Sequence, residues 1–225
     1  MRPAFAVSPP ELAVVTASGG VQCLKSGDGT LTTTAGTATR GDTLRCRLVA
    51  SLRLPKSIRL IIPNDPVALE ASALDASGKS LDDVPFQVSA SNPNVFGVQD
   101  GLLAPLAVGT AELSVTVGEK SATVPVTVVR KLKAEPLLLN DGNRVSWSLN
   151  QGNYEIEAQV RAADGSRHGV TLSWVGGADC KDQGEAQKLS GHCTIENAGS
   201  VIIENPTTFG MGPAADGVVA MYEVP

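Results

Sequence analysis

The sequence predicts an all-β protein built from two-sheet sandwiches. Short runs rich in Val, Thr, Ile and Ala alternate with Gly, Asn, Asp and Pro, which is the pattern of strands joined by turns. Long stretches with apolar residues at i, i+3, i+4 and i+7, the pattern of amphipathic helices, are missing. Strands this short and this closely spaced bury their apolar faces most readily as a sandwich of two sheets.

Length and charge narrow the class of protein further. The 225 residues are 42% hydrophobic, which is enough to form cores for two or more domains. The net charge of -5 comes from scattered acidic and basic residues, without a basic stripe that could follow successive phosphates, so we do not expect a nucleic-acid partner. No apolar run reaches the roughly 20 residues of a membrane-spanning helix. The start "MRPAFAVSPPE" lacks the apolar core of a signal peptide, so we expect any export signal to lie upstream or to have been removed.

The chain contains an internal repeat. The segment from Val7 to Val49 can be laid over the segment from Ser89 to Val129. The equivalent pairs are Pro10 and Pro93, Leu12 and Val95, Val15 and Val98, Gly27 and Gly109, and Leu44, Cys46 and Leu48 with Val124, Val126 and Val128. Residues 1–50 therefore match only the second half of a unit that spans about 51–130, and the first unit lacks its opening strands.

Alternating apolar residues place the strands of the complete unit around one core. Two such rows flank the turn "GEK" and predict an antiparallel pair. An earlier row is followed by the turn "DASGKS", after which the alternation resumes. The inward residues predicted in this way are Val67, Leu69, Ala71, Ala73, Phe86, Val88, Leu113, Val115, Val117, Val124, Val126 and Val128.

The complete unit resembles the bacterial immunoglobulin-like repeats of group 2, found in invasin- and intimin-like adhesins. The resemblance is carried by an apolar-Asx turn, the corner "SASNPNV", the turn "QDGL", the bend "VGTA" and the closing strand "ATVPVTV". The usual Trp near the corner is replaced by Phe86 or Val88. The resemblance implies tandem immunoglobulin-like sandwiches with a structural or adhesive role outside the cytoplasm.

Residues from 132 onward break the repeat pattern. A charged connector, "VRKLKAE", precedes three strands whose inward residues include Trp147, Tyr154 and Trp174. We expect these aromatic rings to fill the core rather than to form a platform for sugar rings, because each is in register with aliphatic residues. The segment "LNQGNYEIEAQV" resembles the strand-turn-strand of bacterial jelly-roll domains, including prepeptidase C-terminal and carbohydrate-binding modules. We thus predict a partial unit at 1–50, an immunoglobulin-like domain at 51–131 and a jelly-roll-like sandwich at 132–225.

The four cysteines fall into two local pairs. We expect disulfides between Cys23 and Cys46 and between Cys180 and Cys193, although free buried thiols would give the same pattern. A zinc site at His192 and Cys193 is disfavoured, because adjacent strand residues point to opposite faces and the usual ligand spacing is missing. Disulfides indicate an oxidising, extracytoplasmic location.

We predict neither a cofactor nor an enzymatic activity. Calcium would most readily bind at "NDGN" (140–143) or "LDD" (81–83), but neither has the spacing of a dedicated loop. The motifs of common hydrolases and nucleotide-binding sites are missing, and the chain has two histidines. Glu155 and Glu157 resemble a glycosidase pair only in lying on one outward face, which solvent exposure already explains.

The Gly- and Pro-rich stretch "NPTTFGMGPAADG" (205–217) is the predicted contact surface, together with the polar loop between Cys180 and Cys193. We expect Phe209 and Tyr222 to lie near this stretch as exposed aromatic residues. The candidate ligand-contact residues are Asn205, Thr208, Phe209, Met211 and Tyr222.

These features favour an exported bacterial protein of the cell surface or periplasm with a structural or adhesive role. Its repeats would act as a spacer that presents the C-terminal domain to a surface protein or polysaccharide. One alternative is a carbohydrate-binding accessory module of a larger secreted enzyme. Another is a self-assembling subunit of a surface layer or appendage, in which the incomplete N-terminal unit leaves a strand edge for a neighbour to complete.

Overall fold

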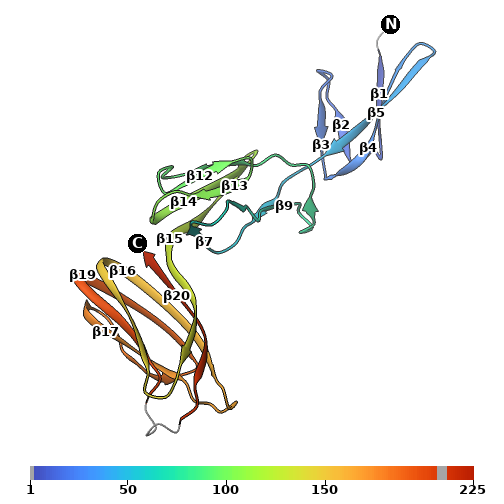
Figure 1. The fold of residues 1–225 in the computed structure, drawn as a ribbon. Helices are drawn as coiled ribbons and strands as arrows, with labels where there is room; N and C mark the ends of the chain where they lie inside the picture. The colour runs from blue at the N-terminus through green and yellow to red at the C-terminus, as the bar shows by residue number, and fades with distance from the viewer. Residues whose placement is uncertain (1–2, 207–211) are drawn as a thin grey trace. The chain divides into compact units, whose positions relative to one another are not determined.

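The computed structural model describes residues 3–206 and 212–225, and all regular elements within these ranges are strands (Figure 1). The predicted all-β class is therefore confirmed. The chain forms two compact units. The first comprises Met1–Lys56, Leu69–Ser89 and Leu113–Val124, and the second comprises Ser57–Ala68, Ala90–Glu112 and Pro125–Pro225. The predicted middle domain contributes strands to both units.

The N-terminal repeat consists of a three-stranded antiparallel sheet and a hairpin. The sheet has the order β1-β4-β5, and β2 pairs with β3 (Figure 1). Within residues 3–48, the buried residues of this core are Leu12, Ala13 and Cys46, with Val7, Cys23 and Leu44 packed against them. This core is small for a folded unit. The strands are β1 (Ala4–Ser8), β2 (Ala13–Val15), β3 (Val21–Cys23), β4 (Gly27–Ala35) and β5 (Ala38–Cys46).

The strands of the middle segment are short except for the last two. They are β6 (Ser51–Arg53), β7 (Ile58–Ile62), β8 (Val67–Ala68), β9 (Ser72–Leu74), β10 (Ser80–Leu81), β11 (Gln87–Ala90), β12 (Phe96–Gln99), β13 (Leu102–Pro105), β14 (Gly109–Val117) and β15 (Lys120–Leu139). Small sheets form in the orders β10-β9-β6 and β12-β13-β8, and β11 lies beside β14. The inward rows predicted on β14 and β15 are confirmed, because Leu113, Val115, Val117, Val124, Val126 and Val128 are all buried.

Local hydrogen bonds confirm the internal repeat. The amide of Leu24 donates to the carbonyl of Leu12 (2.8 Å), and the amide of Leu106 donates in the same way to Val95 (2.9 Å). Leu12 and Val95 are both buried, so equivalent corners carry equivalent apolar residues.

One part of the predicted alignment shifts by two residues. The turn before β5 and the turn within the β14–β15 hairpin have glycines with positive φ, Gly36 at 62° and Gly118 at 57°. Counted from these glycines, Cys46 corresponds to Val128 rather than to Val126. A shift of two keeps the same face inward. Of the predicted row, Cys46 is buried and Leu44 packs against it, whereas Leu48 is 41% exposed.

The C-terminal domain is one long sheet that bends to enclose its core (Figure 1). Its strands follow the order β15-β20-β16-β19-β17-β18. The register of β16 with β19 shifts between Asn150 and Gly152, and such bulges allow a strand to bend. The strands are β16 (Arg144–Ala162), β17 (Val170–Ala178), β18 (Gln183–Ala186), β19 (Lys188–Glu204) and β20 (Ala215–Val224).

The charged connector is not a loop. Residues 129–135 lie within β15, which pairs in parallel with β7 over Val126–Arg130 and antiparallel with β20 from Arg130 to Leu139. The register with β20 shifts between Lys131 and Lys133. Before this bulge the buried row includes Val126 and Val128, and after it Leu137 and Leu139. The extra residue therefore changes which parity of β15 faces the core.

A substitution at Gly191 on β19 tests how closely the core of the C-terminal domain is packed. A Cβ there would lie 2.6 Å from Leu172 Cδ2 and 3.2 Å from Trp174 Cζ2. We expect Gly191→Ala to destabilise the domain by about 1–3 kcal/mol through overpacking, measured by chemical denaturation. The control is Gly184→Ala on β18, where an added Cβ meets nothing within 4 Å. Equal stability of the two variants would contradict this packing.

Removing the disulfide of the N-terminal repeat would show how far the stability of this repeat depends on it. Cys46 is one of three fully buried residues there and is bonded to Cys23. Because a crosslink of this loop length stabilises by about 3 kcal/mol, we expect Cys23→Ala/Cys46→Ala to unfold residues 3–48. Amide hydrogen exchange would report the loss. The control, Cys180→Ala/Cys193→Ala, should leave exchange in residues 3–48 unchanged, and retained protection in the first variant would contradict the prediction.

Candidate functional site

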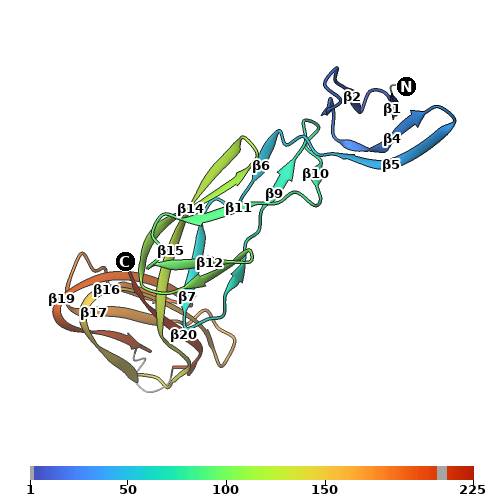
Figure 2. The same cartoon turned by 90° about the horizontal axis from the view of Figure 1, so that it is seen from above.

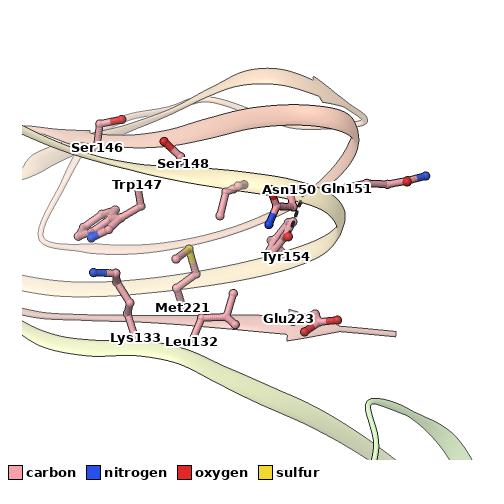
Figure 3. Close-up of a pocket in the computed structure, with 11 residues that line it drawn as sticks. Leu132, Lys133, Ser146, Trp147, Ser148, Asn150, Gln151, Tyr154, Met221 and Glu223 are labelled. Carbon is pink, nitrogen blue, oxygen red and sulfur yellow. Dashed lines mark hydrogen bonds between the residues drawn. The ribbon is translucent and has the colours of Figure 1, made fainter.

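The C-terminal domain contains a pocket of about 590 Å³. It lies between residues of β15, β16 and β20 (Figure 3). Here the first part of β16 pairs with β19 and the last part of β15 pairs with β20, while no pairing joins β15 to β16 within the described ranges. The pocket thus occupies an opening in the enclosing sheet. Its lining residues include Leu132, Lys133, Trp147, Tyr154, Met221 and Glu223.

The polar groups around this pocket bond to one another. The Trp147 indole Nε1 donates to Glu135 Oε1 at 3.0 Å, bridging the gap between β16 and β15. The Tyr154 hydroxyl donates to the Asn150 carbonyl at 3.0 Å. Burial, and secondarily the charge of Glu223, raises the pKa of Tyr154, which keeps its hydroxyl protonated as the donor. The aromatic donors of Trp147 and Tyr154 that line this pocket are therefore already engaged within the domain.

The predicted placement of the aromatic residues in the core is confirmed. Trp147, Tyr154 and Trp174 are only 8%, 6% and 9% exposed and belong to one apolar cluster with Ile156 and Leu172. Their rings are covered by neighbouring side chains, so no exposed face is left on which a sugar could stack.

Both predicted disulfides are present. Cys23 is bonded to Cys46 and Cys180 to Cys193, with Cα atoms 5.6 and 4.4 Å apart. Gly177 lies against the second disulfide, where an added Cβ would overlap both sulfur atoms. The segment between Cys180 and Cys193 differs from the predicted loop, because it contains β18 and the start of β19.

Asn205 was predicted as a ligand-contact residue, and this is wrong. Its side chain is fully buried. Its amide nitrogen donates to the carbonyls of Leu139 and Pro213, at 2.9 and 3.0 Å. Its amide oxygen faces His168 Nε2, while His168 Nδ1 lies 2.8 Å from Glu185 Oε1. The residue therefore holds the end of the domain together instead of facing solvent.

Tyr222 lies away from the stretch with which it was grouped. It is seven residues beyond Ala215, where β20 begins, and this corresponds to about 23 Å along a strand. The side chain of Tyr222 is partly exposed. The guanidinium carbon of Arg59, Cζ, lies 4.9 Å from the centroid of the Tyr222 ring. The other candidates, Thr208, Phe209 and Met211, lie outside the described residues.

Two charged groups lie where β7, β15, β16 and β20 meet, and together we call them the junction cluster. Arg59, Glu155 and Tyr222 lie on one face of the sheet, and Arg130 and Glu223 lie on the other. Arg59 Nη1 lies 2.8 Å from Glu155 Oε2, and Arg130 Nη1 lies 2.6 Å from Glu223 Oε2. Arg59 belongs to β7, Arg130 to β15, Glu155 to β16 and Glu223 to β20. Arg59 therefore joins β7 to β16 and β20, and Arg130 joins β15 to β20.

Sequence patterns alone do not predict this cluster. Arg59 and Glu155 are 96 positions apart, and each reads as an ordinary outward charge on a strand. Glu155 was weighed as one of a glycosidase pair with Glu157, but its carboxylate is occupied by Arg59. Only the parallel pairing of β7 with β15 brings the two charges together.

Of the two calcium candidates, "NDGN" (140–143) has ordinary turn geometry, whereas Asp83 of "LDD" has a φ of 60° and its Oδ2 lies 3.6 Å from Arg45 Nη1. The amide of Asn143 donates to the carbonyl of Asn140 at 3.0 Å, and Gly142 has a φ of 73°. Across residues 3–206 and 212–225, no three His, Cys, Asp or Glu side chains gather as metal ligands would. The same part of the chain includes no helix of the length and apolarity needed to cross a membrane.

No protein-family model and no curated protein matches this sequence. Among solved structures, domains 4 and 5 of the S-layer protein SbsC align over 56% of this chain and 70% of that chain, with 16% identity and a TM-score of 0.33. The surface layer protein SbsC, domains 4–9, aligns over 96% and 38%, with 14% identity and a TM-score of 0.32. The chain thus spans well under half of the longer structure. TM-scores of this size establish neither a shared fold nor a shared function.

Because the Asn205 side chain is hydrogen-bonded in the interior, we expect replacing it with the nearly isosteric Asp to lower the stability of the domain strongly. Asn205→Asp would place a carboxylate oxygen against the carbonyl oxygens of Leu139 and Pro213. We expect a loss of at least about 2 kcal/mol in unfolding free energy, because buried acceptors would be left without donors. The control is Asn197→Asp, at an exposed position on β19. Thermal and chemical denaturation would compare the two, and an unchanged stability of Asn205→Asp would contradict the buried network.

Proposed function

We propose that this chain is a non-enzymatic, load-bearing structural segment of a protein outside the cytoplasm. The observation that carries the proposal is the continuity of β15, one strand of 20 residues that pairs with β7 and then with β20. A spacer must pass force from one domain to the next without a weak point. A shared strand does so through its backbone and through the hydrogen-bond ladders on its sides.

The pairing of β15 suits a tensile role. β7 runs parallel to β15 over five registered pairs, and β20 runs antiparallel to it over nine. Force along β15 loads these bonds side by side in shear, so they share it. The junction cluster adds ion pairs across the same place. Exposed ion pairs contribute little singly, about 0–1 kcal/mol each, but one of these connects β7 to β16 and the other connects β15 to β20.

The disulfides support a location outside the cytoplasm. All four cysteines are paired, and such bonds persist in oxidising compartments. Within this proposal, residues 51–131 act as an immunoglobulin-like spacer of the bacterial group 2 kind, which the corner and turn motifs of the sequence favour. The surface-layer or appendage alternative also fits a load-bearing segment, whereas the covered rings of Trp147, Tyr154 and Trp174 give no support to a polysaccharide site.

Single-molecule force spectroscopy on the full chain, held at its two ends, tests the proposal. We expect Arg59→Ala/Arg130→Ala to lower the force at which residues 57–225 unfold, because it removes both ion pairs and the contact with Tyr222. The matched control is Arg144→Ala, an exposed arginine on β16. It should unfold at the force of the unmodified chain.

Two results would contradict the proposed role. One is that β15 of the unmodified chain separates from β7 or from β20 at low force, as expected for domains joined by a weak linker. The other is saturable co-sedimentation of the chain with peptidoglycan or another insoluble glycan, which would instead indicate a recognition module.

A further inference from the structure

The outer edge of β5 in the N-terminal repeat has no partner strand in the described part of the chain. The sheet order β1-β4-β5 places β5 at the margin, and β4 pairs with its inner side from Cys46 to Ala38 (Figure 2). A margin of this length presents a row of backbone N–H and C=O groups, which is a ready template for another strand.

In the second repeat the equivalent edge carries a residue that hinders strand pairing, whereas in the first repeat it does not. Counted from the turn glycines Gly36 and Gly118, residue 43 corresponds to residue 125. Position 125 is a proline, a residue that cannot donate to a ladder and that protects edge strands. Position 43 is a threonine. In the second repeat β7 covers Val126–Arg130, which corresponds to residues 44–48, so even an equivalent upstream strand would leave Ala38–Thr43 open.

The charges on β5 fit a second copy of the same strand. Arg40 and Asp42 lie on one face, flank Gly41 and bond to each other, with Arg40 Nη2 2.8 Å from Asp42 Oδ1. Arg40 is 80% exposed. If two β5 strands pair antiparallel about a two-fold axis at Gly41, Arg40 of each copy lies opposite Asp42 of the other. The same register sets Thr39 opposite Thr43, a favourable cross-strand pair.

Neighbouring symmetric registers do not fit. Centring the pair on Arg40 or on Asp42 places two like charges directly opposite each other, which is unfavourable. The remaining side chains near the centre are small, because the face that holds Thr39, Gly41 and Thr43 continues across β4 as Thr34, Thr32 and Thr30. The sheets can therefore meet without bulky side chains at the axis.

We propose that β5 is a homodimerisation edge, at which two copies of this chain pair antiparallel about Gly41 to form a continuous six-stranded sheet. The occupant is a second copy, because Arg40 and Asp42 are complementary to themselves under a two-fold axis. This inference goes beyond the load-bearing role, since it concerns residues of the other compact unit. The contact is far smaller than a standard interface of about 1,600 Å², so the association is weak and reversible.

Sedimentation velocity of the full chain over a range of concentrations at low salt tests the charge pairing. We expect a concentration-dependent dimer. Arg40→Asp and Asp42→Arg should each weaken it at least about tenfold, since both symmetry-related pairs become repulsive. An equimolar mixture of these two variants should dimerise again, and so should the double variant Arg40→Asp/Asp42→Arg. Arg53→Asp, at an exposed arginine of β6, is the control and should have no effect.

Cysteine crosslinking tests the register. Residues 41 of two copies would have Cα atoms about 4.5 or 5.5 Å apart, inside the disulfide range of about 4.4–6.8 Å. A Cβ at Gly41 has room, with Thr30 Cγ2 at 3.4 Å. We expect Gly41→Cys to give a disulfide-linked dimer on oxidation and Ala38→Cys to give little. Circular dichroism of each variant checks that the fold is retained.

Three outcomes would overturn the proposal. The chain could stay monomeric at every concentration, which would leave the edge to a different occupant such as an upstream strand. Dimerisation could be insensitive to Arg40→Asp, which would place the contact elsewhere. Crosslinking could be as efficient at 38 as at 41, which would exclude the two-fold register at Gly41.

Discussion

The structure depends most on one constraint: a single strand, β15, must serve two cores. A strand presents alternate residues to alternate faces, so a continuous β15 would keep one parity inward throughout. Val126 and Val128 are buried in the first part, whereas Leu137 and Leu139 are buried in the second. The register shift between Lys131 and Lys133 resolves this conflict by adding one residue. The charged residues occupy the place where neither core requires a side chain.

The same constraint explains what could be predicted from the sequence. Alternation within each core is local, so the buried rows of β14 and β15, the aromatic residues of the core and the strand class follow from the residue pattern alone. The prediction fails at Val67 on the two-residue strand β8, which is 48% exposed. The disulfides follow from cysteine pairing in sequence. The continuity of β15 does not, because a bulge between two apolar rows has the composition of a linker. "VRKLKAE" was interpreted as one for that reason.

The error at Asn205 has a different physical cause. Asn followed by Pro in a Gly-rich stretch is typical of an exposed turn. Here the amide bonds to a carbonyl of Leu139, 66 positions away, and to that of Pro213. A buried amide is tolerated only when its donors and acceptor are satisfied, and these partners come together only in the folded domain. The junction cluster escaped prediction for the same reason, since Arg59 finds Glu155 only through the pairing of β7.

The two repeats show how one fold responds to different surroundings. The second has strands on both sides of β15 and a proline at the one exposed part of that edge. The first has only three fully buried residues and adds a disulfide, which compensates for missing apolar burial by restricting the unfolded chain. If the first repeat were shaped for stability alone, a proline at position 43 would protect its edge as Pro125 protects the other. Instead, Arg40, Gly41 and Asp42 make that edge complementary to the same edge of a second copy. An edge that would otherwise favour unspecific aggregation therefore carries residues that select one partner and one register.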